Sequence, residues 1–170
     1  MGQARSRDGS VAGDLLVGAL AGAAAVWAMD RLDWAMYDRV SPAARRQTKA
    51  ARPRGLDPAH VIANTAAEAL GARLSPAQPH PAGIAVHYGL GMGMGAAYAA
   101  LAPRTPVLGA GRGLLFGLLM FAAQDEGLNT VLGTAGPPGR YPWQAHARGA
   151  VAHGFFGVVL DTLLRLAGRR

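Results

Sequence analysis

The segment from Pro81 to Pro103 contains no Asp, Glu, Lys or Arg, and it constrains the fold more than any other part of the sequence. A helix needs roughly 20 apolar residues to cross the hydrocarbon core of a bilayer. A soluble protein of 170 residues would have to bury this segment on all sides. A small soluble bundle remains the alternative, but the length of the segment favours a membrane helix over residues 81–103.

Three further segments predict membrane helices. The first covers residues 14–38 and has a polar carboxyl-terminal third, the next covers 106–123, and the last covers 147–166. Residues 1–13 are expected to form a polar tail, and residues 14–170 a single membrane domain. The predicted fold class is all-α: an integral membrane four-helix bundle with one amphipathic interfacial helix.

The segments between these spans are polar or rich in turn-forming residues. Residues 39–57 contain prolines and many basic side chains, which predicts a basic linker. Asp57 and Pro58 are typical of an N-cap and a first helical residue, so a surface helix is expected over 58–73. Glycines and prolines predict a loop over 124–144.

Composition excludes several function classes. The chain has no cysteine, which rules out disulfides, thiol catalysis and iron–sulfur clusters. Its net charge of +7 would suit nucleic acid, but basic residues beside a bilayer favour acidic lipid head groups as partners and not nucleic acid. The serines lie outside the spans, and the glycine-rich segments complete no phosphate-binding loop. We therefore expect no enzyme activity, no catalytic residue, no cofactor and no metal site.

Small residues recur at four-residue spacing in the expected spans. In lipid, such faces let helix backbones approach closely. They predict packing between helices of this chain, and they leave open packing against a second copy or another membrane protein. The glycines concerned are Gly18, Gly22, Gly91, Gly95, Gly113, Gly117 and Gly157.

Polar side chains are expected to gather at one membrane face, because four antiparallel spans bring alternate helix ends together. Charged groups in a span usually face the protein interior and pair with something. Two interpretations remain open: the cluster binds protons or small ions, or its hydrogen bonds only fix the packing of the helices. In a simpler alternative, the first helix leaves the membrane near Asp30. The candidates are Asp30, Asp33, His87, Tyr98, Asp125, Glu126, His153 and Asp161, with His146 beside them.

A weak internal repeat relates two helix pairs. Each pair combines a Gly-x3-Gly span, an acidic residue eight positions after the second glycine, and a histidine followed by glycine four positions later. Membrane folds often contain such repeats, although a chain rich in Gly and Ala also produces chance matches. The aligned residues are Gly18 with Gly113, Gly22 with Gly117, Asp30 with Asp125, His87 with His153, and Gly91 with Gly157.

Taken in order along the chain, the motifs resemble those of the YagU-like family of small bacterial inner-membrane proteins, a family of unknown biochemical function. The motifs stand here as Gly18 and Gly22, His87 and Tyr98, Gly113 and Gly117, Pro137 and Pro138, Pro142 and Trp143, and His153 with Asp161. The resemblance implies a multi-pass protein of the bacterial inner (cytoplasmic) membrane with both termini inside, and it implies no reaction.

The sequence thus predicts a multi-pass membrane protein with one of two roles. In the first, the His and carboxylate cluster handles protons or small ions, or senses pH. In the second, the chain is a structural or accessory membrane subunit that packs through its glycine-rich faces. Whether the polar cluster faces a cavity or a sealed helix contact would distinguish these roles.

Overall fold

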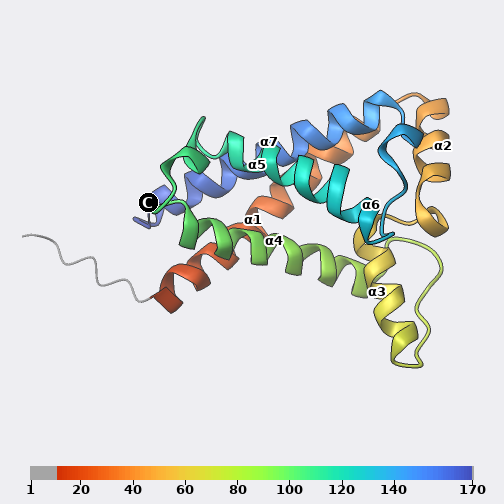
Figure 1. Ribbon diagram of the computed structural model, residues 1–170, viewed down its shortest axis with the longest axis horizontal. Helices are drawn as coiled ribbons and strands as arrows, with labels where there is room; N and C mark the ends of the chain where they lie inside the picture. The colour runs from red at the N-terminus through yellow and green to blue at the C-terminus, as the bar shows by residue number, and fades with distance from the viewer. Residues whose placement is uncertain (1–10, 170) are drawn as a thin grey trace, which may run out of the picture.

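The computed structural model describes residues 11–169, and all regular secondary structure in that range is helical. Three helices are long and apolar enough to cross a membrane: α1 (Val11–Tyr37), α4 (Pro81–Leu101) and α7 (Trp143–Leu166). α1 packs against both α4 and α7 (Figure 1). This architecture is compatible with a membrane protein.

The predicted span over 106–123 has a different structure. Pro106–Gly109 is a 3₁₀ turn, and the helix begins only with α5 (Leu114–Met120). It continues as a π-helical segment, η3 (Phe121–Leu128), and ends in α6 (Asn129–Val131). The predicted start of this span is wrong, because glycines with positive φ interrupt the chain before α5. The predicted loop is also wrong up to Val131, and a bundle of four spanning helices is not confirmed.

The other predicted boundaries agree more closely with the structure. α1 begins three residues before position 14, and the rest of the predicted polar tail, residues 1–10, lies outside the described residues. α4 ends two residues before the predicted boundary at 103. α7 begins at Trp143 and not at 147, because Pro142 has an extended backbone and directly precedes the first helical turn.

The segment between α1 and α4 folds into a cap over one end of the long helices. The predicted linker contains α2 (Pro42–Ala51), followed by a 3₁₀ turn, Pro53–Gly55. Small residues on one face of α2 are buried, so a segment that resembles a linker by its charge still forms a packed helix. α3 spans Pro58–Ala69 and is shorter than predicted, while the predicted N-cap is confirmed: the Asp57 carboxylate accepts a hydrogen bond from the His60 N–H at 3.0 Å.

These cap elements lie at the same end of the molecule as α6, opposite the carboxyl terminus (Figure 1). The loop that follows α6 also belongs to this end and contains a 3₁₀ turn, Pro138–Arg140. It contacts the cap: the Gln47 side-chain amide donates a hydrogen bond to the Arg140 carbonyl at 3.2 Å. Chain segments far apart in sequence therefore meet at this end.

Glycines form the closest contact between α1 and α4. A Cβ atom on Gly18 would lie 2.6 Å from the Gly95 carbonyl oxygen, and one on Gly22 would overlap the Gly91 carbonyl oxygen. The two backbones thus approach as closely as the absence of side chains allows.

A second contact of the same kind joins α5 to α7. A Cβ atom on Gly113 would overlap the Gly157 carbonyl oxygen, and one on Gly117 would overlap the His153 carbonyl oxygen. Gly113 also has a φ of +84°, which an L-side chain rarely adopts. Both its conformation and its surroundings therefore require glycine.

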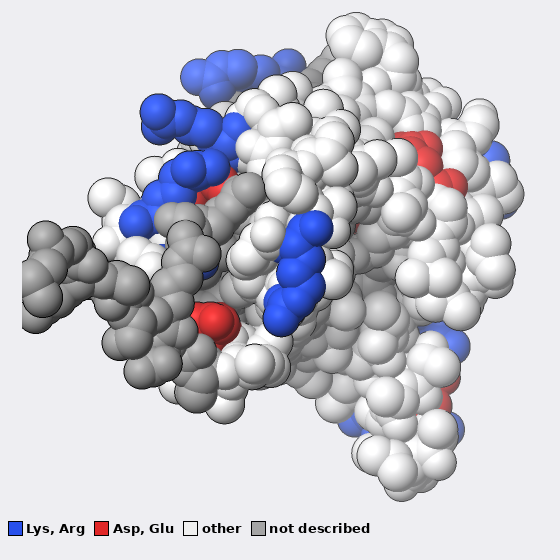
Figure 2. Space-filling model, turned by 60° about the vertical axis from the view of Figure 1, so that its left-hand side comes forward, with Lys and Arg blue, Asp and Glu red and all other residues white. Residues whose placement is uncertain are grey.

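The outer surface of the long helices is largely apolar. Figure 2 shows wide uncharged areas, with basic side chains gathered in a few groups. Exposed large apolar side chains on a helix that can cross a membrane are expected to face lipid. Examples on the three long helices are Leu16, Leu20, Trp27, Leu101, Val151 and Leu166.

Candidate functional site

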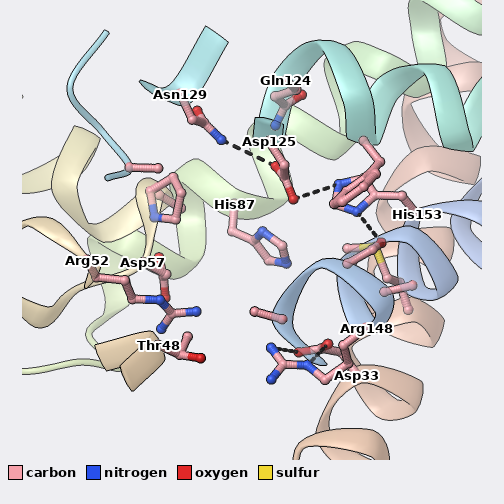
Figure 3. Close-up of a pocket in the computed structure, with 18 of the residues that line it drawn as sticks. Asp33, Thr48, Arg52, Asp57, His87, Gln124, Asp125, Asn129, Arg148 and His153 are labelled. Carbon is pink, nitrogen blue, oxygen red and sulfur yellow. Dashed lines mark hydrogen bonds and ion pairs between the residues drawn. The ribbon is translucent and has the colours of Figure 1, made fainter. Parts of the chain in front are cut away.

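A cavity of about 670 Å³ lies between the cap and the ends of the long helices (Figure 3). Its walls come from α1, α2, α3, the segment before α4, α4, η3, α6, the loop after α6, and α7. Charged side chains alternate there with apolar ones such as Ile84, Leu90 and Phe121. The predicted polar residues at this end therefore surround a space and not a sealed contact.

Four histidine–carboxylate pairs line the cavity. Three of them join different elements: α4 to α1, and α7 to η3 twice. The fourth lies within the first turn of α3. The pairs and their N–O distances are His87 with Asp30 (2.9 Å), His146 with Glu126 (2.7 Å), His153 with Asp125 (3.7 Å) and His60 with Asp57 (2.8 Å).

The hydrogen-bond acceptors around His153 and His146 indicate which ring nitrogens carry protons. His153 Nδ1 lies 2.9 Å from the Gly149 carbonyl oxygen and donates to it, so Nε2 is the atom that faces Asp125. His146 faces acceptors with both nitrogens, since Nε2 lies 3.2 Å from the Pro138 carbonyl oxygen. A doubly protonated imidazolium would satisfy both acceptors at His146.

An arginine–aspartate pair closes another part of the wall. Arg148 of α7 binds Asp33 of α1 through two hydrogen bonds, of 2.6 and 3.3 Å. Its guanidinium also lies 4.8 Å from the centre of the Tyr37 ring. This pair fixes the end of α1 against α7 beside the cavity.

The π-helical segment η3 positions both carboxylates of its side of the cavity. π-helical turns are often found at functional sites, where an extra residue changes the direction of neighbouring side chains. Here Asp125 and Glu126 are adjacent in sequence, yet they reach histidines two helical turns apart on α7. Asn129 also donates to Asp125, at 3.3 Å.

A smaller cavity of about 70 Å³ lies deeper between the helices. Its polar lining consists of His87, Gln124 and His153, and the remaining lining is apolar. The apolar residues are Val26, Met29, Leu90, Gly91, Met94, Met120 and Phe156. A layer of apolar side chains therefore lies between the helices, next to the polar cavity.

Two residues of the predicted cluster lie beyond this layer. The Tyr98 hydroxyl donates to Asp161 at 2.7 Å, and Arg165 Nε donates to the same carboxylate at 2.7 Å. Tyr98 and Asp161 are 0% exposed, and neither lines the large cavity. The structure thus divides the predicted cluster into a cavity group and a separate buried pair between α4 and α7.

Residues that are matched in the internal alignment also make matching contacts in the structure. Asp30 lies next to His87, and the aligned Asp125 lies next to His153. The aligned glycines line the two close helix contacts. The two helix pairs, α1 with α4 and α5–η3 with α7, therefore present related histidine–aspartate pairs to one cavity.

Several cavity residues are not apparent from the sequence. The sequence predicts Asp57 only as a helix cap, although it also pairs with His60. Arg148 lies near the start of the last predicted span, and a charge in that position is the signal that could identify it. Arg52 and Thr48 belong to the predicted linker, and the helix that forms there brings them to the wall.

Comparison of the chain with protein-family models, with curated proteins and with solved structures finds no match. Its function must therefore be inferred from the chemistry of the cavity.

Proposed function

We propose that this chain is a multi-pass membrane protein that binds protons in its polar cavity and thereby senses pH at one face of the membrane. The observation that carries the proposal is the set of three histidine–carboxylate pairs that join different elements around one cavity. Histidine is the side chain whose charge normally changes between about pH 5 and 8. The YagU-like motifs support a place in the bacterial inner membrane as part of the same proposal.

Proton binding would act on the contacts between elements. A neutral imidazole gives a carboxylate at most one hydrogen bond, from whichever nitrogen carries the proton, whereas an imidazolium donates from both nitrogens and adds the attraction between opposite charges. Protonation of His87 would therefore tighten α4 against α1, and protonation of His146 and His153 would tighten α7 against η3. The other ionisable groups on the cavity wall are Arg31, Asp33, Arg52, Tyr88, Tyr141 and Arg148.

The apolar layer favours sensing over conduction. Met94, Met120 and Phe156 line the small cavity but not the large one. Across them, the next polar pair is Tyr98 with Asp161, which is held in its own hydrogen bonds. A conduction path for protons or small ions would require water to enter this layer.

The test compares the position of the cap at two pH values. Because the chain has no cysteine, two introduced cysteines, Arg46→Cys on α2 and Val151→Cys on α7, would be the only sites to which spin labels attach. We expect the distance between the labels to change between about pH 8 and 5 in lipid nanodiscs. Replacing His87, His146 and His153 together by Gln should abolish the change, whereas a His60→Gln control should largely retain it. A distance that does not depend on pH in the unmodified background contradicts the proposal.

A proteoliposome assay addresses proton or ion handling. Under an imposed pH gradient, a pH-sensing protein leaves the internal pH unchanged, and a conducting one dissipates the gradient. Dissipation that is lost in His87→Gln would replace sensing by conduction as the function of the cavity.

The structural or accessory role remains the second candidate. The observation that favours it is the close glycine contact between helices. These contacts lie within this chain, however, so they do not by themselves support a contact with a second copy or a partner.

A further inference from the structure

Two oppositely charged groups in the cavity are held less tightly than the others. Asp125 lies 3.3 Å from Asn129 and 3.7 Å from His153, whereas the other three carboxylates of the histidine pairs have an N–O contact of 2.9 Å or less. Arg52 lines the cavity, and within residues 11–169 its guanidinium forms no ion pair. Arg31 also lines the cavity without an ion pair among the described residues, but its guanidinium lies 4.9 and 4.7 Å from the centres of the Trp27 and Trp34 rings. The wall therefore retains Asp125 and Arg52 as charged groups with free binding capacity.

These two groups lie on opposite sides of the cavity. Figure 3 shows Arg52, Thr48 and Asp57 on one side and Asp125, Asn129 and His153 on the other, with His87 between them. The Thr48 hydroxyl donates to the Ala44 carbonyl at 2.9 Å, so its oxygen can still accept a hydrogen bond. Opposite charges across an open space attract a ligand that carries both charges at separate ends.

We propose that the cavity binds a small zwitterion, with its carboxylate or phosphate at Arg52 and its ammonium group at Asp125. This inference rests on the proposed function in that it takes the same cavity as the working site. Arg52 can bind the anion through two parallel N–H donors, and Asp125 can accept from the ammonium group. The ligand would join the cap, which carries Arg52, to the helix that carries Asp125.

The size and lining of the cavity support an organic ligand in place of a bare ion. A volume of about 670 Å³ falls within the range of small-molecule sites, which is roughly 300–1,000 Å³. Ile84, Leu90 and Phe121 supply apolar wall for a hydrocarbon chain between the two charges. In the part of the chain that the structure describes, no three His, Asp or Glu side chains are arranged to hold a metal ion.

A homologous series of ω-amino acids tests the proposal. Glycine, 4-aminobutanoate, 6-aminohexanoate and 8-aminooctanoate separate the same two charges by increasing distances. Binding is measured by isothermal titration calorimetry at one fixed pH, in nanodiscs of phosphatidylglycerol, which contain no zwitterionic lipid. We expect an optimum beyond glycine, because the two charges of the ligand must reach opposite walls. Butylamine and butanoate, each with one charge, should bind at least about tenfold more weakly than the best member of the series.

Variants identify the two ends of the site. Arg52→Gln and Asp125→Asn should each weaken the best ligand by about tenfold or more, since each removes a charge-assisted hydrogen bond. Arg46→Gln is the matched control: Arg46 is an exposed arginine on α2, the helix that directly precedes Arg52, and it does not line the cavity. Binding that is equal in Arg52→Gln, Asp125→Asn and Arg46→Gln overturns the proposal.

A further arm separates a soluble ligand from a lipid head group. Phosphoethanolamine is titrated as a soluble zwitterion, and phosphatidylethanolamine is introduced into the nanodiscs as a competitor. If phosphatidylethanolamine in the nanodiscs competes with the soluble ligand, and Arg52→Gln abolishes this competition, the site binds a lipid head group. If ω-amino acids bind and phosphatidylethanolamine does not compete with them, the site binds a soluble zwitterion. If no zwitterion binds while the spin-label distance still responds to pH, this inference fails and the proposed function stands.

Discussion

The two helix pairs that the internal alignment relates differ in how they hold their carboxylates. In the first pair, α1 is a regular α-helix and Asp30 contacts His87 at 2.9 Å. In the second pair, the carboxylate lies on the π-helical segment η3, and Asp125 is 3.7 Å from His153. Both pairs are in close backbone contact at their glycines. Related sequence patterns thus produce one closed and one looser histidine–aspartate pair.

The physical origin of this difference is the extra residue of the π-helical turn. It brings two successive carboxylates to α7, so that Glu126 forms the short contact with His146 while Asp125 is left with longer ones. The helix loses regular α-helical hydrogen bonding over these turns. The second helix pair therefore has a less regular helix than the first, and it places one more charged group on the cavity wall.

The largest expected effect concerns the feature that the two pairs share. Gly22→Leu and Gly117→Leu should both destabilise the protein strongly, because a side chain at either position meets the backbone of the facing helix. Overpacking of a close contact costs about 1–3 kcal/mol and sometimes more, and a carbonyl oxygen cannot change its rotamer to make room. Thermal unfolding in detergent, together with the yield of monodisperse protein, measures the loss.

Gly89→Leu provides the matched control for these two variants. Gly89 lies on α4, and a Cβ atom added there would have no neighbour within 4 Å, so this substitution should have little effect on stability. Equal loss in all three variants would mean that glycine content, and not the helix contact, determines stability.

The next largest loss of stability is expected at the hydrogen bond that joins the two helix pairs. Tyr98 lies on α4 and Asp161 on α7, and their hydrogen bond of 2.7 Å joins the first pair to the second. Tyr98→Phe keeps the ring, which packs against Phe116, and removes the donor. We expect a loss of about 1–2 kcal/mol, as for hydrogen bonds between membrane helices in model peptides. The histidines of the cavity should titrate as before, which NMR of ¹⁵N-labelled histidine would show; altered titration would mean that the two polar groups are coupled.

A smaller effect tests the difference between the pairs directly. Asp30→Asn and Asp125→Asn each remove one carboxylate charge while conserving size. Asp30→Asn should lower stability by about 0.5–1.5 kcal/mol, because it removes the charge from the shorter contact between two helices. Asp125→Asn should cost less, because its contacts are longer. Unfolding of both variants at about pH 6 compares them, and an equal or greater loss in Asp125→Asn would contradict the distinction.

The sequence predicts the parts of the fold that depend on length and local pattern. The apolar segment at 81–103 is helical almost to its predicted ends, and the Asp57 cap follows from a short local motif. The gathering of Asp30, His87 and His153 follows from the antiparallel order of the spans, because helix ends on one side must meet.

The errors arise where the structure depends on tertiary context. A π-helical turn has no distinct periodicity in an 18-residue segment, so glycines and charges from 124 onward predict a loop. The inward face of α2 consists of Ala44, Thr48 and Ala51, which are too small and too weakly apolar to stand out among basic residues. Arg52 and the cavity itself are unpredictable for the same reason, since the cap creates the wall on which they depend.

The smallest expected effect concerns the cap, which is inserted only in the first helix pair. Arg54 and Glu68 form two hydrogen bonds there, of 2.6 and 3.0 Å, and both side chains are about half exposed. The hydrogen bond from Arg54 holds the pKa of Glu68 below its ordinary value of 4.5. A carboxyl group whose pKa is lower in the folded state stabilises the fold above its ordinary pKa, and this contribution is lost as the pH falls through the folded value. The difference in melting temperature between the unmodified protein and Glu68→Gln should therefore be small and constant well above pH 4.5, and it should disappear as the pH falls through the lowered pKa of Glu68. Added salt should reduce the difference at neutral pH, because an exposed ion pair is screened. A difference that persists at low pH would show that Glu68 acts through packing and not through its charge.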